Sequence, residues 1–130
     1  MKTAVRYYSR SGNTKLLAEA LARGAGTEAV SVEGGELTER ADVLFVGGAL
    51  YAYGLDKKLR AWLDALDPGK VGKAVVFSTS WLSRHGLELI RQALTEKGIP
   101  VDEAAFYAKN RPTPEQLAAA ERFAGEKVAG

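Results

Sequence analysis

The sequence predicts an α/β fold, a doubly wound five-stranded parallel sheet with helices on both faces. Apolar runs rich in Val, Tyr and Phe alternate along the chain with segments of helical periodicity. A hydroxyl-rich loop joins the first apolar run directly to the first helical segment, where a doubly wound fold places its phosphate site. The chain has 130 residues, of which 46% are hydrophobic, so we expect a single domain over residues 1–130.

The elements follow from the local pattern in chain order. The first apolar run begins at the second residue and leads into an amphipathic helical segment, and further strand and helix patterns alternate after it. Residues 33–40 are too few and too rich in glycine for a full helix, so a loop or a single turn is expected there. The expected strands span residues 2–8, 28–32, 42–48, 73–79 and 103–108, and the expected helices span residues 13–24, 55–66, 85–97 and 114–127.

Two of the expected helices have further signals. The expected second helix has one apolar stripe, which places Trp62 in the predicted core. The stripe consists of Leu55, Leu59, Trp62, Leu63 and Leu66. The last helix has a clear start, because Thr113 can serve as N-cap and Pro114 suits the first helical position. Gln116 would complete a capping box with Thr113.

The composition excludes several classes of function. Lys and Arg total 18 against 16 Asp and Glu, and both signs are spread over the two halves of the chain, so no nucleic-acid-binding face is expected. The chain has no Cys, which excludes disulfides, thiolate metal sites and Cys nucleophiles. No apolar run approaches the roughly twenty residues of a membrane span, and the first residues have no signal-peptide profile. We therefore expect a cytoplasmic protein with no membrane span, no metal and no catalytic side chain. Any chemistry that it performs must then come from a bound cofactor.

The loop after the first strand has the residue types of a phosphate-binding site. The backbone can curl tightly at Gly12, and a helix that opens at Asn13 presents free N–H groups and a positive dipole end. Ser, Thr and Asn are also ordinary N-cap residues, so simple capping is the alternative. The density of such residues favours phosphate binding, with Arg10 either adding a charge-assisted contact or pointing into water. The candidate residues are Ser9, Arg10, Ser11, Gly12, Asn13 and Thr14.

The spacing of this loop excludes the G-x-G-x-x-G and G-x-x-x-x-G-K-[ST] nucleotide loops. The pattern Ser-x-Ser-Gly-Asn-Thr after the first strand instead resembles the FMN phosphate loop of the flavodoxin family. The resemblance covers nearly the whole chain and implies the flavodoxin-like strand order 2-1-3-4-5. The chain lacks the insertion that splits the final strand of long-chain members, so it looks like a short-chain form.

Two further loops are expected at the same edge of the sheet, because parallel strands end together there. In the flavodoxin family the flavin ring lies between these loops, with a tyrosine or tryptophan on one face. Tyr51, Tyr53 and Trp81 are candidates for this stacking, and ordinary packing is the alternative for each. The candidates are Gly48, Ala49, Leu50, Tyr51, Ala52, Tyr53 and Gly54 after the third strand, and Ser78, Thr79, Ser80, Trp81 and Arg84 after the fourth.

Two charged candidates follow the fourth strand. A cation there would stabilise negative charge on a reduced flavin, and the alternative is a solvated residue at the start of the next helix. We favour the solvated alternative for His85, while both roles stay open for Arg84.

The resemblance implies an FMN-binding electron carrier that passes electrons between a reductase and an acceptor protein, as a monomer or weak dimer. The alternative is a small FMN-dependent oxidoreductase, similar to a quinone reductase or protoporphyrinogen oxidase, and a ligand-free scaffold is a third reading. A phosphoacceptor receiver is excluded, because Tyr8, Ser9 and Arg10 stand where its acidic pair is needed. Flavodoxins are usually acidic, so the formal charge of +2 predicts a less negative potential for the second electron.

Overall fold

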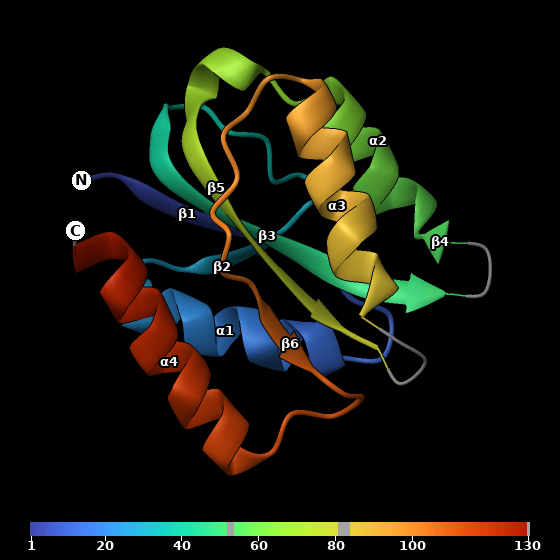
Figure 1. The fold of residues 1–130 in the computed structure, drawn as a ribbon, viewed down its shortest axis with the longest axis vertical. Helices are drawn as coiled ribbons and strands as arrows, with labels where there is room; N and C mark the ends of the chain where they lie inside the picture. Colours follow the sequence, from blue (N-terminus) through green and yellow to red (C-terminus); the bar gives the residue numbers. More distant parts are fainter. Residues whose placement is uncertain (52–53, 81–83, 130) are drawn as a thin grey trace.

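The computed structural model describes residues 1–51, 54–80 and 84–129, and its centre is a parallel β-sheet (Figure 1). The sheet has the strand order β2-β1-β3-β5-β6, which is the order predicted from the resemblance. A short strand, β4, adds to this sheet by pairing antiparallel with the end of β3. The strands are β1 (Thr3–Tyr8), β2 (Ala29–Ser31), β3 (Ala41–Tyr51), β4 (Gly54–Leu55), β5 (Val71–Thr79) and β6 (Phe106–Ala108).

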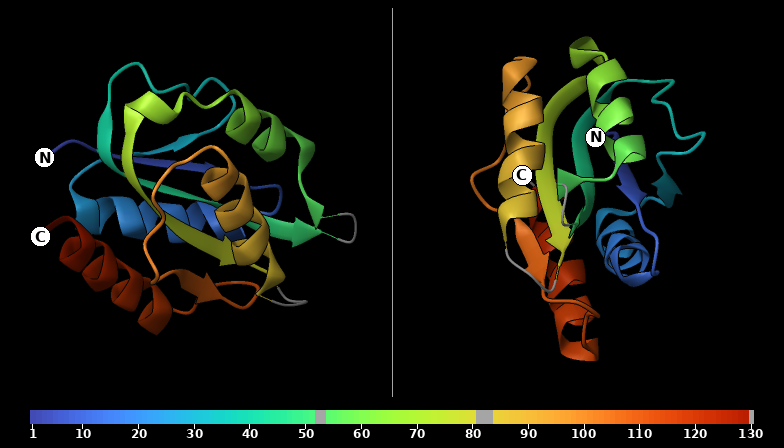
Figure 2. Two further views of the ribbon diagram at one scale, coloured as in Figure 1. Left: turned by 45° about the horizontal axis from the view of Figure 1, so that its top comes forward. Right: turned by 90° about the vertical axis from the view of Figure 1, so that its right-hand side faces the viewer.

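Four α-helices cover the sheet among the described residues. Helices α1 (Asn13–Ala25) and α4 (Pro114–Ala129) pack side by side on one face. Helices α2 (Lys57–Ala65) and α3 (His85–Glu96) cover the other face, and Figures 1 and 2 show the two pairs on opposite sides of the strands. A single 3₁₀ turn, η1 (Pro68–Lys70), leads into β5. The predicted fold class is confirmed.

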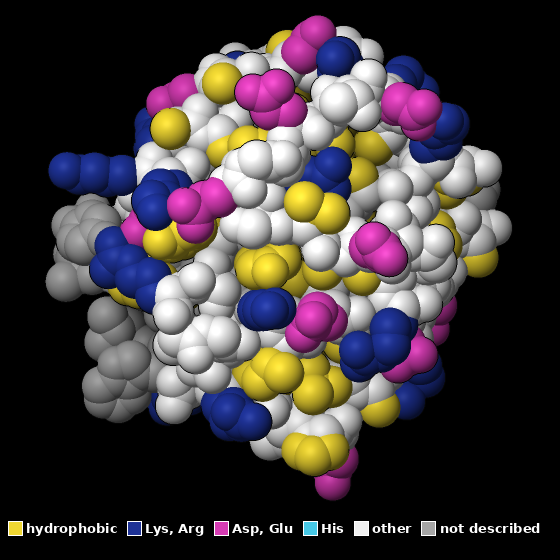
Figure 3. All heavy atoms as spheres, turned by 180° about the vertical axis from the view of Figure 1, so that it is seen from behind, with side chains coloured by type: hydrophobic (Ala, Val, Ile, Leu, Met, Phe, Trp, Pro, Cys, Tyr) yellow, Lys and Arg dark blue, Asp and Glu magenta, His cyan; other side chains and the backbone are white. Residues whose placement is uncertain are grey.

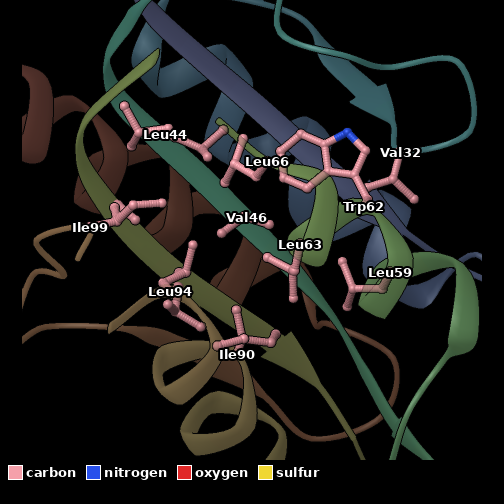
Figure 4. Close-up of a cluster of buried hydrophobic side chains, with 14 of the residues drawn as sticks. Val32, Leu44, Val46, Leu59, Trp62, Leu63, Leu66, Ile90, Leu94 and Ile99 are labelled. Atoms are coloured by element: carbon pink, nitrogen blue, oxygen red, sulfur yellow. The ribbon is translucent and has the colours of Figure 1, made fainter. Parts of the chain in front are cut away.

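The two helical layers cover two separate hydrophobic clusters, and β3 contributes to both. Val43 and Phe45 pack with α1 and α4, while Leu44 and Val46 pack with α2 and α3 (Figure 4). Successive side chains of a strand point to opposite faces, so a strand covered on both faces reads as a continuous apolar run. This explains why the run Val-Leu-Phe-Val signals a central strand.

The apolar stripe of the second helix is buried as predicted, with Trp62 9% and Leu63 0% exposed. The start of the helix was predicted too early, because Leu55 belongs to β4. The carboxylate of Asp56 accepts the backbone N–H of Lys58 at 2.8 Å, and this N-cap sets the start of α2 at Lys57.

The capping box of the last helix is confirmed in both directions. The backbone N–H of Gln116 donates to Thr113 Oγ1 at 3.1 Å, and the N–H of Thr113 donates to Gln116 Oε1 at 2.9 Å. The segment at 33–40 also follows the prediction, because it contains turns and loop but no helix. Trp62 Nε1 donates to the carbonyl of Gly35 at 3.2 Å and holds this loop against α2.

The last strand is shorter than predicted. The chain forms an isolated bridge between Val101 and Ala74, and β6 begins only at Phe106. Between them, the N–H of Ala104 donates to the carboxylate of Asp102 at 2.8 Å. This local turn draws the chain away from β5, so residues 103–105 do not continue the ladder.

Candidate functional site

The ends of three parallel strands bring the predicted loops to one edge of the sheet. Gly48 of β3 is the register partner of Tyr8 on β1 and of Ser78 on β5. Ala49 and Thr79 are partners one step further along. The ends of β1 and β5 therefore lie level with Gly48 and Ala49, whereas β3 continues to Tyr51. The residues expected in a loop after the third strand instead form the end of β3 and, from Gly54, the start of β4, because the chain turns back in an antiparallel pairing there.

The loop after β1 curls at Gly12, which is the N-cap of α1 and has a left-handed φ of 93°. Glycine adopts this conformation without the strain that a side chain would add. Apart from its chain neighbours, a Cβ atom at Gly12 would have no heavy atom within 4 Å, so the space above the loop is open. Gly12 itself has no side chain that could accept a helical N–H group, so side-chain capping at this end of α1 comes from the serines of the loop.

The two serines of the loop fold it onto itself. Ser9 Oγ accepts the N–H of Gly12 at 3.0 Å, and Ser11 Oγ accepts the N–H of Asn13 at 3.5 Å. The first N–H groups of a helix have no carbonyl partner within the helix, and they carry its positive dipole end. The loop thus places hydroxyl groups and helical N–H groups beside the open space at Gly12, an arrangement that suits a phosphate group.

Buried hydroxyl groups connect this loop to β5. Thr14 Oγ1 and Thr79 Oγ1 share a hydrogen bond at 2.5 Å, and both residues are almost fully buried. Ser78 Oγ donates to the carbonyl of Gly48 at 2.7 Å, so this predicted site residue links β5 to β3. The carbonyl of Ser80 accepts the hydroxyl of Tyr107.

The paired glycines at the end of β3 allow close approach of protein atoms. A Cβ atom at Gly47 would lie 2.2 Å from the carbonyl oxygen of Phe77. At Gly48 it would lie 2.5 Å from Leu59 Cδ2 on α2. The protein atoms that approach these glycines belong to β5 and α2, and the contact of Gly48 with a ligand stays a prediction. Ala49 and Leu50 continue β3, and Leu50 pairs with Leu55 of β4.

Arg10 occupies a position that the sequence did not suggest. Its Nε and Nη2 atoms donate to Asp56 Oδ2 at 2.9 and 2.5 Å. Its guanidinium carbon lies 4.2 Å from the centre of the Tyr51 ring. The Arg10 side chain is also 47% exposed, which agrees with the expectation that it points into water, and its contact with a phosphate stays a prediction. Asp56 was missed, because a single carboxylate 46 residues from Arg10 gives no local signal.

The loop after β6 also reaches this edge, and sequence reasoning missed it. Asn13 Nδ2 donates to Asn110 Oδ1 at 3.2 Å, and Asn110 has a positive φ of 59°. The guanidinium of Arg84 lies 5.1 Å from the centre of the Tyr107 ring. Applying the carboxyl-end rule to the last strand would have identified Tyr107 and Asn110 as candidates.

The remaining candidates are placed as follows. His85 begins α3, is exposed and lies 3.2 Å from a carboxylate oxygen of Glu88. Gly54 begins β4 with a φ of 109°. Ala52, Tyr53 and Trp81 lie outside the described residues, so their proposed roles stay predictions.

A hollow of about 1110 Å³ adjoins the loop after β1, between Tyr8 and Arg10 on one side and Leu89 of α3 on the other. Lys58 lines it and lies 5.6 Å from the Tyr8 ring. A hydrogen bond to Glu33 and the charge of that carboxylate raise the pKa of Lys58, so the ammonium stays charged near neutral pH.

The described residues contain no cluster of three or more His, Cys, Asp and Glu that could hold a metal ion. Within the same part of the chain, no helix is long and apolar enough to cross a membrane.

The strand order, the two helical layers and the loop at the N-terminus of α1 define the flavodoxin-like fold, and this chain has that fold. A flavodoxin from the domain Archaea superposes with a TM-score of 0.89 at 24% identity, covering 100% of both chains. Oxidised Flavodoxin 1 from Bacillus cereus has a TM-score of 0.82 at 21% identity, covering 99% of this chain and 98% of that one. The flavodiiron protein from Giardia intestinalis has a TM-score of 0.84 at 19% identity, and 98% of this chain matches 35% of that protein. No family model and no curated protein sequence matches the chain.

Proposed function

We propose that the protein binds FMN at the carboxyl edge of the sheet and carries electrons between a reductase and an acceptor protein. The observation that carries this proposal is the loop at residues 9–14, where a left-handed Gly12 at the N-terminus of α1 borders open space. The likeness to flavodoxin structures supports a flavin over other phosphate ligands. The cytoplasmic location and the monomeric or weakly dimeric state expected from the sequence belong to the same proposal.

The residues present fit FMN. Its phosphate would meet Ser9, Ser11, Gly12, Asn13 and Thr14, which supply hydroxyl and N–H donors and no carboxylate. At a helix N-terminus, hydroxyl and N–H donors can bind a terminal monophosphate without a Lys or Arg side chain. The ring would lie against the ends of β3 and β5, where the Tyr51 side chain is half-buried. When bound, FMN supplies the redox chemistry, and the chain binds it, orients it and shields it from water.

A titration of the ligand-free protein with FMN tests this function. We expect sub-micromolar binding, with quenched fluorescence and shifted absorbance bands as the ring leaves water. Inorganic phosphate should compete only weakly, because it lacks the ring. Absence of binding would mean that the loop serves another phosphate compound or only starts α1.

A second candidate is a small FMN-dependent oxidoreductase, and the hollow beside Tyr8 and Arg10 favours it. Its volume of about 1110 Å³ lies slightly above the usual range for small-molecule pockets, so it has room for a substrate. NAD(P)H added to the FMN-loaded protein separates the two candidates. Rapid bleaching of the flavin without any reductase would indicate an enzyme, whereas slow bleaching fits a carrier.

A further inference from the structure

The side chain of Arg10 crosses from the proposed phosphate loop to the far side of the site. It contacts Tyr51 at the end of β3 and Asp56 at the start of α2. We propose that Arg10 is a positioning residue that fastens the phosphate loop to these two elements and holds the arrangement that FMN requires. This inference rests on the proposed function for its ligand, but the fastening itself concerns the ligand-free chain.

Asp56 is a fixed anchor, because the residue is only 5% exposed and each carboxylate oxygen has its own donor. Oδ1 accepts the N–H of Lys58 at 2.8 Å, which fixes the carboxylate to the first turn of α2. Oδ2 accepts two N–H groups of Arg10. A buried carboxylate is costly without such partners, so Asp56 holds the guanidinium firmly in place.

Tyr51, at the end of β3, is the second contact of the Arg10 guanidinium. The guanidinium carbon lies 4.2 Å from its ring centre, within the range of a cation–π contact. The flat guanidinium group can stack on a ring and donate two N–H groups to a carboxylate at the same time, whereas a lysine ammonium has no flat face to stack. With one guanidinium group Arg10 thus contacts both the end of β3 and the start of α2, while 47% of its side chain stays exposed.

The phosphate loop needs such external support. Ser11 is exposed, and its internal bond to the N–H of Asn13 is long, at 3.5 Å. Thr14 anchors one end of the loop through Thr79, and Arg10 anchors the other end through Asp56. A loop held in its binding conformation loses less entropy when the ligand arrives, so affinity rises for any ligand that uses this loop and its neighbours.

Amide hydrogen exchange on the ligand-free full chain tests the fastening directly. Asp56→Asn keeps an N-cap side chain of equal quality but removes the charge that holds Arg10. We expect exchange of the Gly12 and Leu16 N–H groups to become about fivefold faster or more. The matched control is Asp64→Asn, which removes a carboxylate from the same helix and breaks only an exposed pair with Arg60. Equal exchange rates in the wild type and Asp56→Asn would overturn the proposal.

Dissociation constants for FMN and for riboflavin, which lacks the phosphate, test the consequence. If Arg10 acts by positioning the phosphate loop, Asp56→Asn weakens FMN binding about fivefold or more and weakens riboflavin binding much less, because riboflavin has no phosphate for the loop to hold, and Asp64→Asn changes neither. Tighter FMN binding in Asp56→Asn would mean that the released Arg10 serves the phosphate directly, and equal weakening of both ligands would mean that the effect does not pass through the phosphate loop; either result would overturn the positioning role. A wild-type chain that binds neither flavin would refute the proposed function, while the exchange result would still decide the fastening.

Discussion

The buried hydroxyl groups of Thr14 and Thr79 depend on each other, because each is the hydrogen-bond partner of the other. Thr14→Val or Thr79→Val alone leaves one buried hydroxyl unsatisfied, so each should lower the free energy of unfolding by about 1–3 kcal/mol. The double variant removes both groups and should lose less than the sum of the single variants. Urea denaturation of the four proteins measures this coupling. Additive losses would show that the two hydroxyl groups act independently.

Gly12 and Gly26 allow the role of the phosphate loop to be separated from backbone strain. They flank α1 and have φ values of 93° and 74°, and at either position an added Cβ atom would meet no heavy atom within 4 Å beyond its chain neighbours. Gly12→Leu and Gly26→Leu should each lower stability by about 1–2 kcal/mol, because both force a side chain into the left-handed region. Only Gly12→Leu should abolish FMN binding in a fluorescence titration, because only its side chain enters the proposed cradle. Tight binding by Gly12→Leu would contradict the cradle.

At the scale of single residues, the sequence predicted which residues form the phosphate loop better than it predicted which residues they contact. The loop at 9–14 could be predicted from adjacent residues, because its hydroxyls, glycine and asparagine lie within one short stretch. The bonds of Arg10 to Asp56 and of Thr14 to Thr79 join residues 46 and 65 positions apart. Such pairs depend on strand order and register, which local patterns do not encode.

The end of β3 is the element where close packing is most demanding. A Cβ atom at Gly47 would lie 2.2 Å from a backbone oxygen of β5, which cannot move without breaking the sheet. At Gly48 the nearest atom is a terminal methyl group of Leu59, at 2.5 Å, which can rotate away. We expect Gly47→Ala to lower stability by more than about 3 kcal/mol, and Gly48→Ala by about 1–3 kcal/mol. Thermal denaturation ranks the two, and a larger loss for Gly48→Ala would contradict this account.

Element boundaries show where the sequence pattern is ambiguous. Leu55 fits the helical spacing of Leu59 and Trp62, yet it lies on β4. The apolar pattern shows only that Leu55 is buried, and a buried side chain can belong to a strand as well as to a helix. The deciding signal was Asp56, an N-cap residue that marks the true start of α2. The capping box at Thr113 was predicted correctly because its two side chains are only three residues apart.

Asp102 connects several layers of the whole molecule. Its carboxylate lies 3.1 Å from Lys73 Nζ on β5 and 3.1 Å from Lys127 Nζ on α4, and Arg91 of α3 donates to its carbonyl at 2.8 Å. Burial alone would raise the pKa of Asp102, but the N–H of Ala104 and the two lysines lower it from 3.8 to about 2. The charged carboxylate therefore favours the folded state.

The stability that this lowered pKa adds is fully present above pH 4 and is lost as the pH falls toward 2. Solvent reaches the lysines, so we expect a contribution of about 1 kcal/mol. Asp102→Asn should be less stable than the wild type at pH 7, and the difference should shrink as the pH is lowered through this window. Urea denaturation at pH 7, 4 and 2.5 measures it. A difference that does not depend on pH would contradict the charge-based account.

The charge of the whole molecule bears on its redox behaviour. The formal net charge is +2, and Figure 3 shows positive and negative side chains interspersed on the face that it displays. An acidic surface opposes extra negative charge on a reduced flavin, and this chain has no net acidic surface to do so. Asp56 also offsets the charge of Arg10 beside the site. With FMN bound as proposed, we expect a potential for the second electron that is less negative than in acidic flavodoxins.

A potentiometric titration of the FMN-loaded protein, run beside an acidic flavodoxin, measures this potential. The expected value should also change little between low and high ionic strength, because a small net charge leaves little long-range field for salt to screen. The acidic protein should shift toward less negative values as salt weakens its repulsion. Asp56→Asn supplies an internal comparison, because it leaves the Arg10 charge unbalanced and should move the potential to a less negative value still. A potential as negative as that of the acidic protein would show that contacts at the ring outweigh the charge of the whole molecule.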